Sequence, residues 1–307
     1  MYARFLFFTL ALFMTQPDAQ TLTFHAILNK PALATTTPDH KIAYGTQIDQ
    51  YAELWLPTPR TKSNARVVIL IHGGCWRADL PGPELVAFLA DDLRKHGVAV
   101  WSITYRRVGT KADNFSPYPD TFLDTANAIE KLREIAPTYG LDLAHIVATG
   151  HSAGGHLALW AAARPRIAST SPLFMKNALP IQRVVGIAAI PDLALFSKVG
   201  AHACGDDTID LLTDTAKRGK PAAYADTSPA VLLPLGISQH LMHGVFDGIV
   251  PPSVGWAYRT RAEKAGENIR LTALEASGHF ELIAPWTVPG RAVVDAIIAA
   301  SKLLTVP

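Results

Sequence analysis

Short apolar runs rich in β-branched residues alternate with longer segments of helical periodicity along most of the chain. Four of these runs begin directly after Arg66 (VVILIH), and at Val98 (VAVWSITYR), His145 (HIVATG) and Arg183 (RVVGIAAI). Strands that are apolar throughout belong in a sheet covered on both faces, and the helices between them provide the crossovers. The pattern therefore predicts an α/β fold with a mainly parallel sheet and helices on both faces. Ligands of such folds bind at the carboxyl ends of the strands.

The same alternation continues to the end of the chain, with one interruption. Further strands are predicted over residues 42–56, 237–244 and 269–275, and helices over 83–97, 120–136, 154–164, 256–266 and 291–304. We expect Pro137 to stop the second of these helices. Residues 191–235 lack the alternation and are interpreted as a small cap-like insertion over the site. The prediction is thus a single domain spanning residues 20–307.

Composition narrows the classes of partner. Of the 307 residues, 49% are hydrophobic and 18% are charged, which describes a chain with a large core and disfavours disorder. The formal net charge is +2, without long runs of either sign, so we expect no nucleic acid and no anionic membrane surface as partner. The 11 histidines show no HExxH or CxxC spacing, and neither a metal site nor a cofactor is predicted.

The first residues have the layout of a secretory signal peptide. Arg4 precedes the apolar run FLFFTLALFM, and a polar stretch follows that offers a cut after Ala19. Ten apolar residues are too few to cross a bilayer as a helix, so no permanent membrane anchor is expected. Residues 1–19 are therefore predicted to be removed and the chain to be exported, the alternative being an ordinary N-terminal helix.

A serine lies in a turn between a predicted strand and a predicted helix, in the sequence Gly150-His151-Ser152-Ala153-Gly154. In a G-x-S-x-G turn of this kind the serine is strained and its hydroxyl is exposed above the sheet, while the glycines let strand and helix approach closely. The free N–H groups at the helix N-terminus point to where an oxyanion would form. Ser152 is therefore the candidate nucleophile.

A second glycine-rich turn, HGGCW at residues 72–76, follows the buried strand VVILI. Backbone N–H groups held about 3 Å from a developing oxyanion stabilise a tetrahedral intermediate. We expect the amides of Gly74, Cys75 and Ala153 to be these donors. The residues expected to support the two turns are His72, Gly73, Gly150 and Gly154.

The other two catalytic candidates follow in the order acid, then histidine. Asp247 comes after the strand at 237–244, and His279 comes after the strand at 269–275. Both loops should therefore lie at the same sheet edge as Ser152, with His279 as the base and Asp247 orienting it.

Other residues compete for these roles. Asp192 follows the strand RVVGIAAI and could be an alternative acid, but it comes one strand too early in the usual order. Glu281 is expected on the wrong side of its loop. His151 and His156 neighbour the serine but should not face its hydroxyl, and His243 belongs to a strand. Two aromatic residues at strand ends either line the pocket or belong to the core: Trp76 and Tyr105.

Cys75 and Cys204 are the two cysteines of the chain. We expect them to lie close together, because the insertion that carries Cys204 should fold over the turn that carries Cys75. Whether they form a disulfide or remain buried thiols is open at this point.

Six motifs give the chain a resemblance to a known family: AELWLP, HGGCW, YRR, GHSAGGHLA, HG…D…VP and SGHF. Over roughly residues 40–305 it resembles the esterase and lipase-like branch of the α/β-hydrolases, which includes kynurenine formamidases and feruloyl or acetyl-xylan esterases. The resemblance implies the α/β-hydrolase fold and serine catalysis.

The expected function is hydrolysis of carboxylic esters with small or aromatic acyl groups through an acyl-enzyme. The insertion is too short for a large lipid-binding lid, and its Leu193, Leu195 and Phe196 either narrow an apolar pocket or seal the insertion onto the sheet. The partner is then a small-molecule ester or formamide. The alternatives are an arylformamidase, an exported serine peptidase and a non-catalytic binding protein of the same fold.

Overall fold

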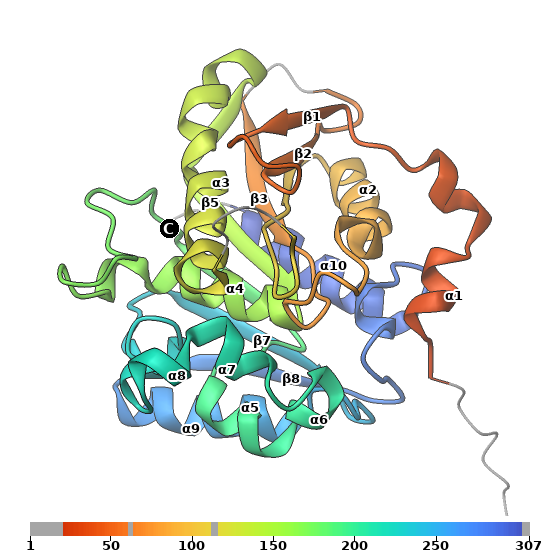
Figure 1. Ribbon diagram of the computed structural model, residues 1–307. Coiled ribbons are helices and arrows are strands. Elements are labelled where there is room, and N and C mark those ends of the chain that lie inside the picture. Colours follow the sequence, from red (N-terminus) through yellow and green to blue (C-terminus); the bar gives the residue numbers. More distant parts are fainter. Residues whose placement is uncertain (1–20, 61–63, 112–115, 303–307) are drawn as a thin grey trace, which may run out of the picture.

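One eight-stranded sheet forms the centre of the molecule (Figure 1). The computed structural model describes residues 21–60, 64–111 and 116–302, so the predicted signal peptide lies outside the described residues. The strand order in the sheet is β1-β2-β4-β3-β5-β6-β7-β8. The strands are β1 (His40–Ala43), β2 (Tyr51–Trp55), β3 (Ala65–Ile71), β4 (Ala99–Ile103), β5 (Leu141–His151), β6 (Arg183–Ile187), β7 (Ser238–Gly244) and β8 (Ile269–Leu274).

Six of the strands are parallel, and the two at one edge are not. In the register, Val68 of β3 lies between Val100 of β4 and Val147 of β5. The strand predicted over residues 42–56 is instead the antiparallel pair β1 and β2. A turn closed by the Tyr44 N–H donating to the Gln50 carbonyl (3.0 Å) reverses the chain between them. The mainly parallel sheet is confirmed.

Helices cover both faces of the sheet (Figure 1). On one face, α2 (Ala87–Lys95) packs against α10 (Val288–Ser301). On the other lie α3 (Pro117–Tyr139), α4 (Ala153–Ala163) and α9 (Pro252–Lys264). Helix α4 has no charged side chain, and all of its residues are buried. Among the described residues, no helix combines the length and apolar character needed to cross a bilayer.

The end of α3 differs from the prediction. Pro137 lies inside its last turn, and the helix continues to Tyr139, where Gly140 adopts a left-handed conformation (φ 66°). A proline so close to a C-terminus removes only one backbone hydrogen bond, and therefore does not stop the helix.

Several short helices fill the connection between β6 and β7 and the region before β1. The former are α5 (Leu193–Val199), α6 (Ala201–Cys204), α7 (Thr208–Thr213), α8 (Thr215–Arg218), η4 (Ala222–Tyr224) and η5 (Pro229–Val231). Before β1 come α1 (Phe24–Leu28) and η1 (Pro31–Thr35); η2 (Pro83–Val86) precedes α2, η3 (Arg164–Arg166) follows α4, and η6 (Glu281–Ile283) precedes α10. Helix α1 packs on η2 at the carboxyl edge of the sheet.

Candidate active site

Ser152 occupies the strained turn that the sequence predicts. Its backbone has φ 56° and ψ −120°, between the end of β5 and the start of α4. The Ser152 N–H donates to the Ile187 carbonyl (2.8 Å), and its own carbonyl accepts the His156 N–H (3.1 Å). A non-glycine residue in such a conformation is costly, and hydrogen bonds to β6 and α4 hold it there.

The glycines on either side of the serine allow three elements to meet. A Cβ atom on Gly150 would collide with the carbonyl oxygen of Gly154, and one on Gly154 would collide with the carbonyl of Ile71 in β3. These contacts are between backbones, which cannot move aside as a side chain can. Only glycine at both positions lets β3, β5 and α4 pack this closely.

The second predicted turn curves around the same place. Gly74, Cys75 and Trp76 all have positive φ (96°, 51° and 54°), and the Arg77 N–H closes the turn on the Gly74 carbonyl (2.8 Å). Gly74 and Cys75 line one cavity together with Ser152. Ala153 is the first residue of α4, so its N–H has no acceptor within the helix. Of the three residues whose amides are expected to bind an oxyanion, two thus line the cavity that contains Ser152, and the third follows Ser152 in the chain.

Buried side chains fix this turn from behind. The Trp76 Nε1–H donates to His156 Nδ1 (3.1 Å), and the His156 Nε2–H donates to the Thr227 carbonyl (2.8 Å). Burial lowers the pKa of His156 to about 4, so its ring stays neutral and accepts from Trp76. Trp76 therefore supports the turn and does not line the cavity.

His72 and Gly73 support the turn from its first residues. The Tyr105 O–H donates to the His72 carbonyl (3.1 Å), the two rings stack at 4.7 Å, and the His72 Nδ1–H donates to the Gly73 carbonyl (2.7 Å). Burial, with the nearby charge of Arg107, lowers the pKa of His72 to about 3. Tyr105 is fully buried. Like Trp76, it supports the turn and does not line the cavity.

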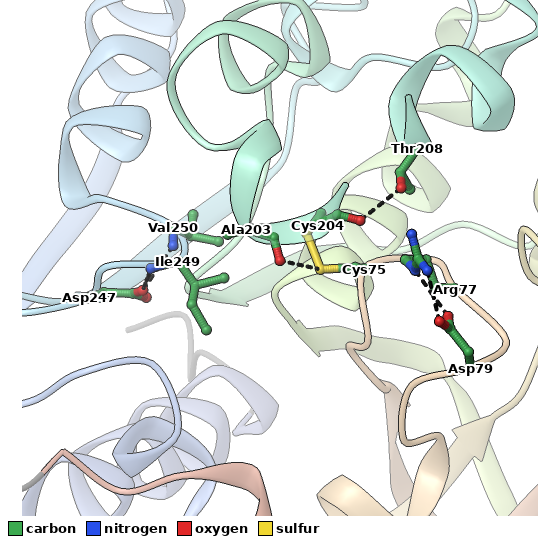
Figure 2. The surroundings of a disulfide bond; sticks show 9 residues. All are labelled: Cys75, Arg77, Asp79, Ala203, Cys204, Thr208, Asp247, Ile249 and Val250. Carbon is green, nitrogen blue, oxygen red and sulfur yellow. Dashed lines mark hydrogen bonds and ion pairs between the residues drawn. A yellow bond between two sulfur atoms is a disulfide. The ribbon is translucent and has the colours of Figure 1, made fainter. Parts of the chain in front are cut away.

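Asp247 and His279 form a buried hydrogen-bonded pair, although 32 positions separate them. The His279 Nδ1–H donates to Asp247 Oδ2 (2.7 Å). Asp247 Oδ1 accepts the N–H groups of Ile249 and Val250, both at 2.8 Å (Figure 2). Burial alone would raise the pKa of the Asp247 carboxyl. The hydrogen bond and charge of His279 and the two N–H groups outweigh burial and lower that pKa below its ordinary value.

His151 has a partner that the sequence reasoning missed. Its Nε2–H donates to the carbonyl of His279 (3.0 Å), and the centroids of the two rings lie 4.3 Å apart. Burial, with the neighbouring His279, lowers the pKa of His151 well below its ordinary value, so the ring remains a neutral donor. His151 therefore holds the backbone of His279. No sequence signal shows this contact, because the two residues are 128 positions apart.

The competing acids have other contacts. Asp192 caps α5 by accepting the Leu195 N–H (3.0 Å), and it pairs with Arg261 (3.4 Å). Glu281 accepts the N–H of Gly278 (3.0 Å) and that of Leu22. Neither carboxylate is hydrogen-bonded to His279 in these contacts.

A cavity of about 330 Å³ contains both Ser152 and His279 in its wall. The insertion contributes Ala203 to this wall. Leu193 and Phe196 are instead fully buried in the core, and Leu195 is not in the wall either, so they do not narrow the pocket. Within residues 21–60, 64–111 and 116–302, no group of three or more His, Cys, Asp or Glu side chains is arranged to hold a metal ion. The absence of a cofactor stays a prediction.

A disulfide joins Cys75 to Cys204, with the two Cα atoms 5.3 Å apart (Figure 2). The predicted proximity of the cysteines is confirmed, and the pair is bonded. The bond connects the turn after β3 to the last residue of α6, whose carbonyl accepts the Thr208 hydroxyl (2.8 Å). The insertion is thus covalently attached to the candidate oxyanion turn.

Comparison with known families agrees with this fold and these turns. The BD-FAE family model matches residues 53–259, more than half of the chain. The chain belongs to the BD-FAE family. This BD-FAE chain is 26% identical over 243 residues to esterase LipQ of Mycobacterium tuberculosis, an alignment covering 76% of this chain and 54% of LipQ. It thus spans about half the length of that curated relative.

Two solved structures show the extent of the shared fold. A truncated carbohydrate esterase from gut microbiota matches this BD-FAE chain with a TM-score of 0.68 and 21% identity, over 85% of this chain and 95% of the other. An inhibited esterase B from Lactobacillus rhamnosis matches with a TM-score of 0.71 and 19% identity, over 86% and 87%. With the sheet described above, they confirm the predicted α/β-hydrolase fold.

Proposed function

We propose that the chain is a serine-dependent hydrolase of carboxylic esters, with Ser152 as the nucleophile, His279 as its base and Asp247 orienting the base. One observation carries the proposal: the strained Ser152 turn and the Asp247–His279 pair meet at one cavity. The fold supplies the strand ends that bring these residues together.

The proposed mechanism begins when His279 Nε2 takes the proton of Ser152 Oγ as that oxygen attacks the acyl carbon. The negative charge on the former carbonyl oxygen is stabilised by the amides of Gly74, Cys75 and Ala153. His279 then gives the proton to the leaving alcohol oxygen. Water attacks the acyl-enzyme with His279 again as base, and the acid leaves as Ser152 recovers its proton.

The proposed substrates carry small or aromatic acyl groups. A volume of about 330 Å³ is at the lower end of the range of ligand pockets. The names of esterase LipQ, the carbohydrate esterase and esterase B favour an ester over a peptide. An arylformamidase remains the second candidate, since a formamide needs the same nucleophile, base and oxyanion donors.

The test compares kcat/KM for p-nitrophenyl acetate, butyrate and decanoate with that for N-formylkynurenine. We expect the two short esters to be preferred. In Ser152→Ala, kcat should fall by on the order of 10³-fold or more, because only binding and oxyanion stabilisation remain. Ser197→Ala is the matched control, since Ser197 Oγ donates to the Ala194 carbonyl and lies outside the cavity wall.

Two results would overturn parts of this proposal. Near-normal turnover in Ser152→Ala would exclude the serine mechanism. A clear preference for N-formylkynurenine would replace the esterase with an arylformamidase, and a preference for decanoate would exclude the small acyl group.

We also propose that the chain is exported. The Cys75–Cys204 disulfide supports this, because such bonds persist in oxidising compartments. Intact-mass analysis of the secreted protein should give a chain that begins at Gln20, lighter by two hydrogens than the reduced form. A full-length product with two free thiols would contradict export.

A further inference from the structure

The segment at residues 21–28 forms part of the cavity wall beside His279. Thr23, Phe24 and His25 line the cavity together with Ser152 and His279. The ring of Phe24 stacks on that of His25, with centroids 4.0 Å apart. Thr23 caps α1 by accepting the Ala26 N–H (3.2 Å). An aromatic surface far from the catalytic motifs in sequence therefore contacts the space where a substrate binds.

Contacts to the loop that carries His279 hold this segment in place. Glu281 accepts the N–H of Leu22 with one carboxylate oxygen and the N–H of Gly278 with the other (3.0 Å). Ile27, three residues after Phe24 in α1, is fully buried in the core. One carboxylate thus connects the segment to the residue that precedes His279, and an apolar anchor fixes α1 on the core.

The aromatic rings continue from the segment to the base. The ring of Phe24 lies 5.9 Å from that of Phe280, and Phe280 lies edge-on at 5.0 Å to His279. Aromatic pairs in this range contact one another favourably. Phe24, Phe280 and His279 therefore form one continuous aromatic wall.

The mechanism decides which half of an ester meets this wall. His279 must give its proton to the leaving alcohol oxygen, so the alcohol half lies on the His279 side of the scissile bond. The acyl half remains on Ser152 with its oxygen toward Gly74 and Cys75. Resting on the proposed function, we infer that Phe24 is a specificity-determining residue that favours esters of flat aromatic alcohols.

Matched substrates separate the two halves of the ester. Benzyl acetate and cyclohexylmethyl acetate have the same acyl group and similar leaving oxygens, but only the first alcohol is flat. In Phe24→Leu, the ratio of kcat/KM for benzyl acetate to that for cyclohexylmethyl acetate should fall about 2- to 10-fold, the range of a lost ring contact. The ratio for benzyl acetate to benzyl butyrate should stay unchanged, because the acyl half is elsewhere.

Phe174→Leu is the control, since Phe174 is 42% exposed and lies outside the cavity wall. Phe24→Ala should lower the alcohol ratio at least as far as Phe24→Leu. An unchanged alcohol ratio in both Phe24 variants, while Ser152→Ala is inactive, would overturn the inference and leave the proposed function standing. Failure of the wild-type protein to hydrolyse any of these esters would overturn both.

Discussion

The two carboxylate oxygens of Asp247 have different partners, and this limits what an amide at the same position can do. Oδ1 accepts two backbone N–H groups, and only Oδ2 faces His279. In Asp247→Asn the amide oxygen must take the place of Oδ1, because an NH₂ group cannot accept. The NH₂ group then faces His279 Nδ1, which must give up its proton, so Nε2 carries the proton and cannot accept that of Ser152.

Asp247→Asn should therefore lower kcat by on the order of 10⁴-fold without loss of folding. The measurement is kcat on p-nitrophenyl acetate beside a thermal unfolding curve. Asp192→Asn is the control, because Asp192 caps α5 and should leave kcat unchanged. If kcat fell as far in Asp192→Asn as in Asp247→Asn, the assignment of Asp247 as the orienting acid would be wrong.

For single residues, the local sequence was sufficient to predict the conformation where that conformation is set by residues nearby in the chain. The strained turn at Ser152 and the presence of a turn at HGGCW follow from motifs of five residues. The contacts of His151 and Glu281 could not be predicted. Each depends on a partner more than 100 positions away. The local sequence around a histidine beside a serine is the same whether or not that distant partner is present.

At the scale of elements, the turn after β3 and helix α6 behave as one unit because the disulfide joins them (Figure 2). A bond that closes a long loop restricts the unfolded chain, and the separation here is 129 residues. Cys204→Ser should lower the free energy of unfolding by roughly 2–5 kcal/mol. It should also lower kcat more than it raises KM, because the amide of Cys75 loses its fixed position.

Urea unfolding and ester hydrolysis, each with and without reductant, measure these effects. Reductant should bring the wild-type protein to the level of Cys204→Ser and should not change the variant. A fully reduced wild-type protein with unchanged stability would contradict the prediction.

Elements with an unambiguous period were predicted well, and those at chain reversals were not. The strands β3, β4, β5 and β6 and helix α4 follow from apolar runs that only a covered sheet can bury. The split of residues 42–56 into β1 and β2 depends on a seven-residue turn, and the end of α3 depends on Gly140 rather than Pro137. In both cases the deciding feature is a short turn, which has too few residues to show a period.

At the scale of the whole molecule, several buried histidines make stability depend on pH. Burial lowers the pKa of His72 to about 3 and those of His156 and His243 to about 4. In the unfolded chain these rings take up protons below about pH 6.5, whereas in the folded protein they stay neutral. Stability is therefore highest above pH 6.5 and falls as the pH is lowered toward 4.

The expected loss is up to about 1.4 kcal/mol per pH unit for each such histidine. The Asp247 carboxyl, with its lowered pKa, adds to the loss only as the pH falls below its ordinary value of 3.8. His243→Leu should reduce the slope between pH 6 and 5 by about one proton, since His243 is fully buried and burial is the main cause of its lowered pKa. Urea unfolding at pH 7, 6 and 5 measures the slope, and a flat profile would be inconsistent with neutral buried rings.

The position of the segment at residues 21–28 also governs how the protein should be produced. Anything fused ahead of Thr21 is joined to the chain only two residues before Thr23, which with Phe24 lines the cavity. The other end of the described chain is remote from it: the carbonyl of Lys302 accepts from Arg183 (3.0 Å) at the first residue of β6, on the amino edge of the sheet. An affinity tag belongs at the C-terminus, and kinetics measured on N-terminally tagged protein would report the tag as well as the enzyme.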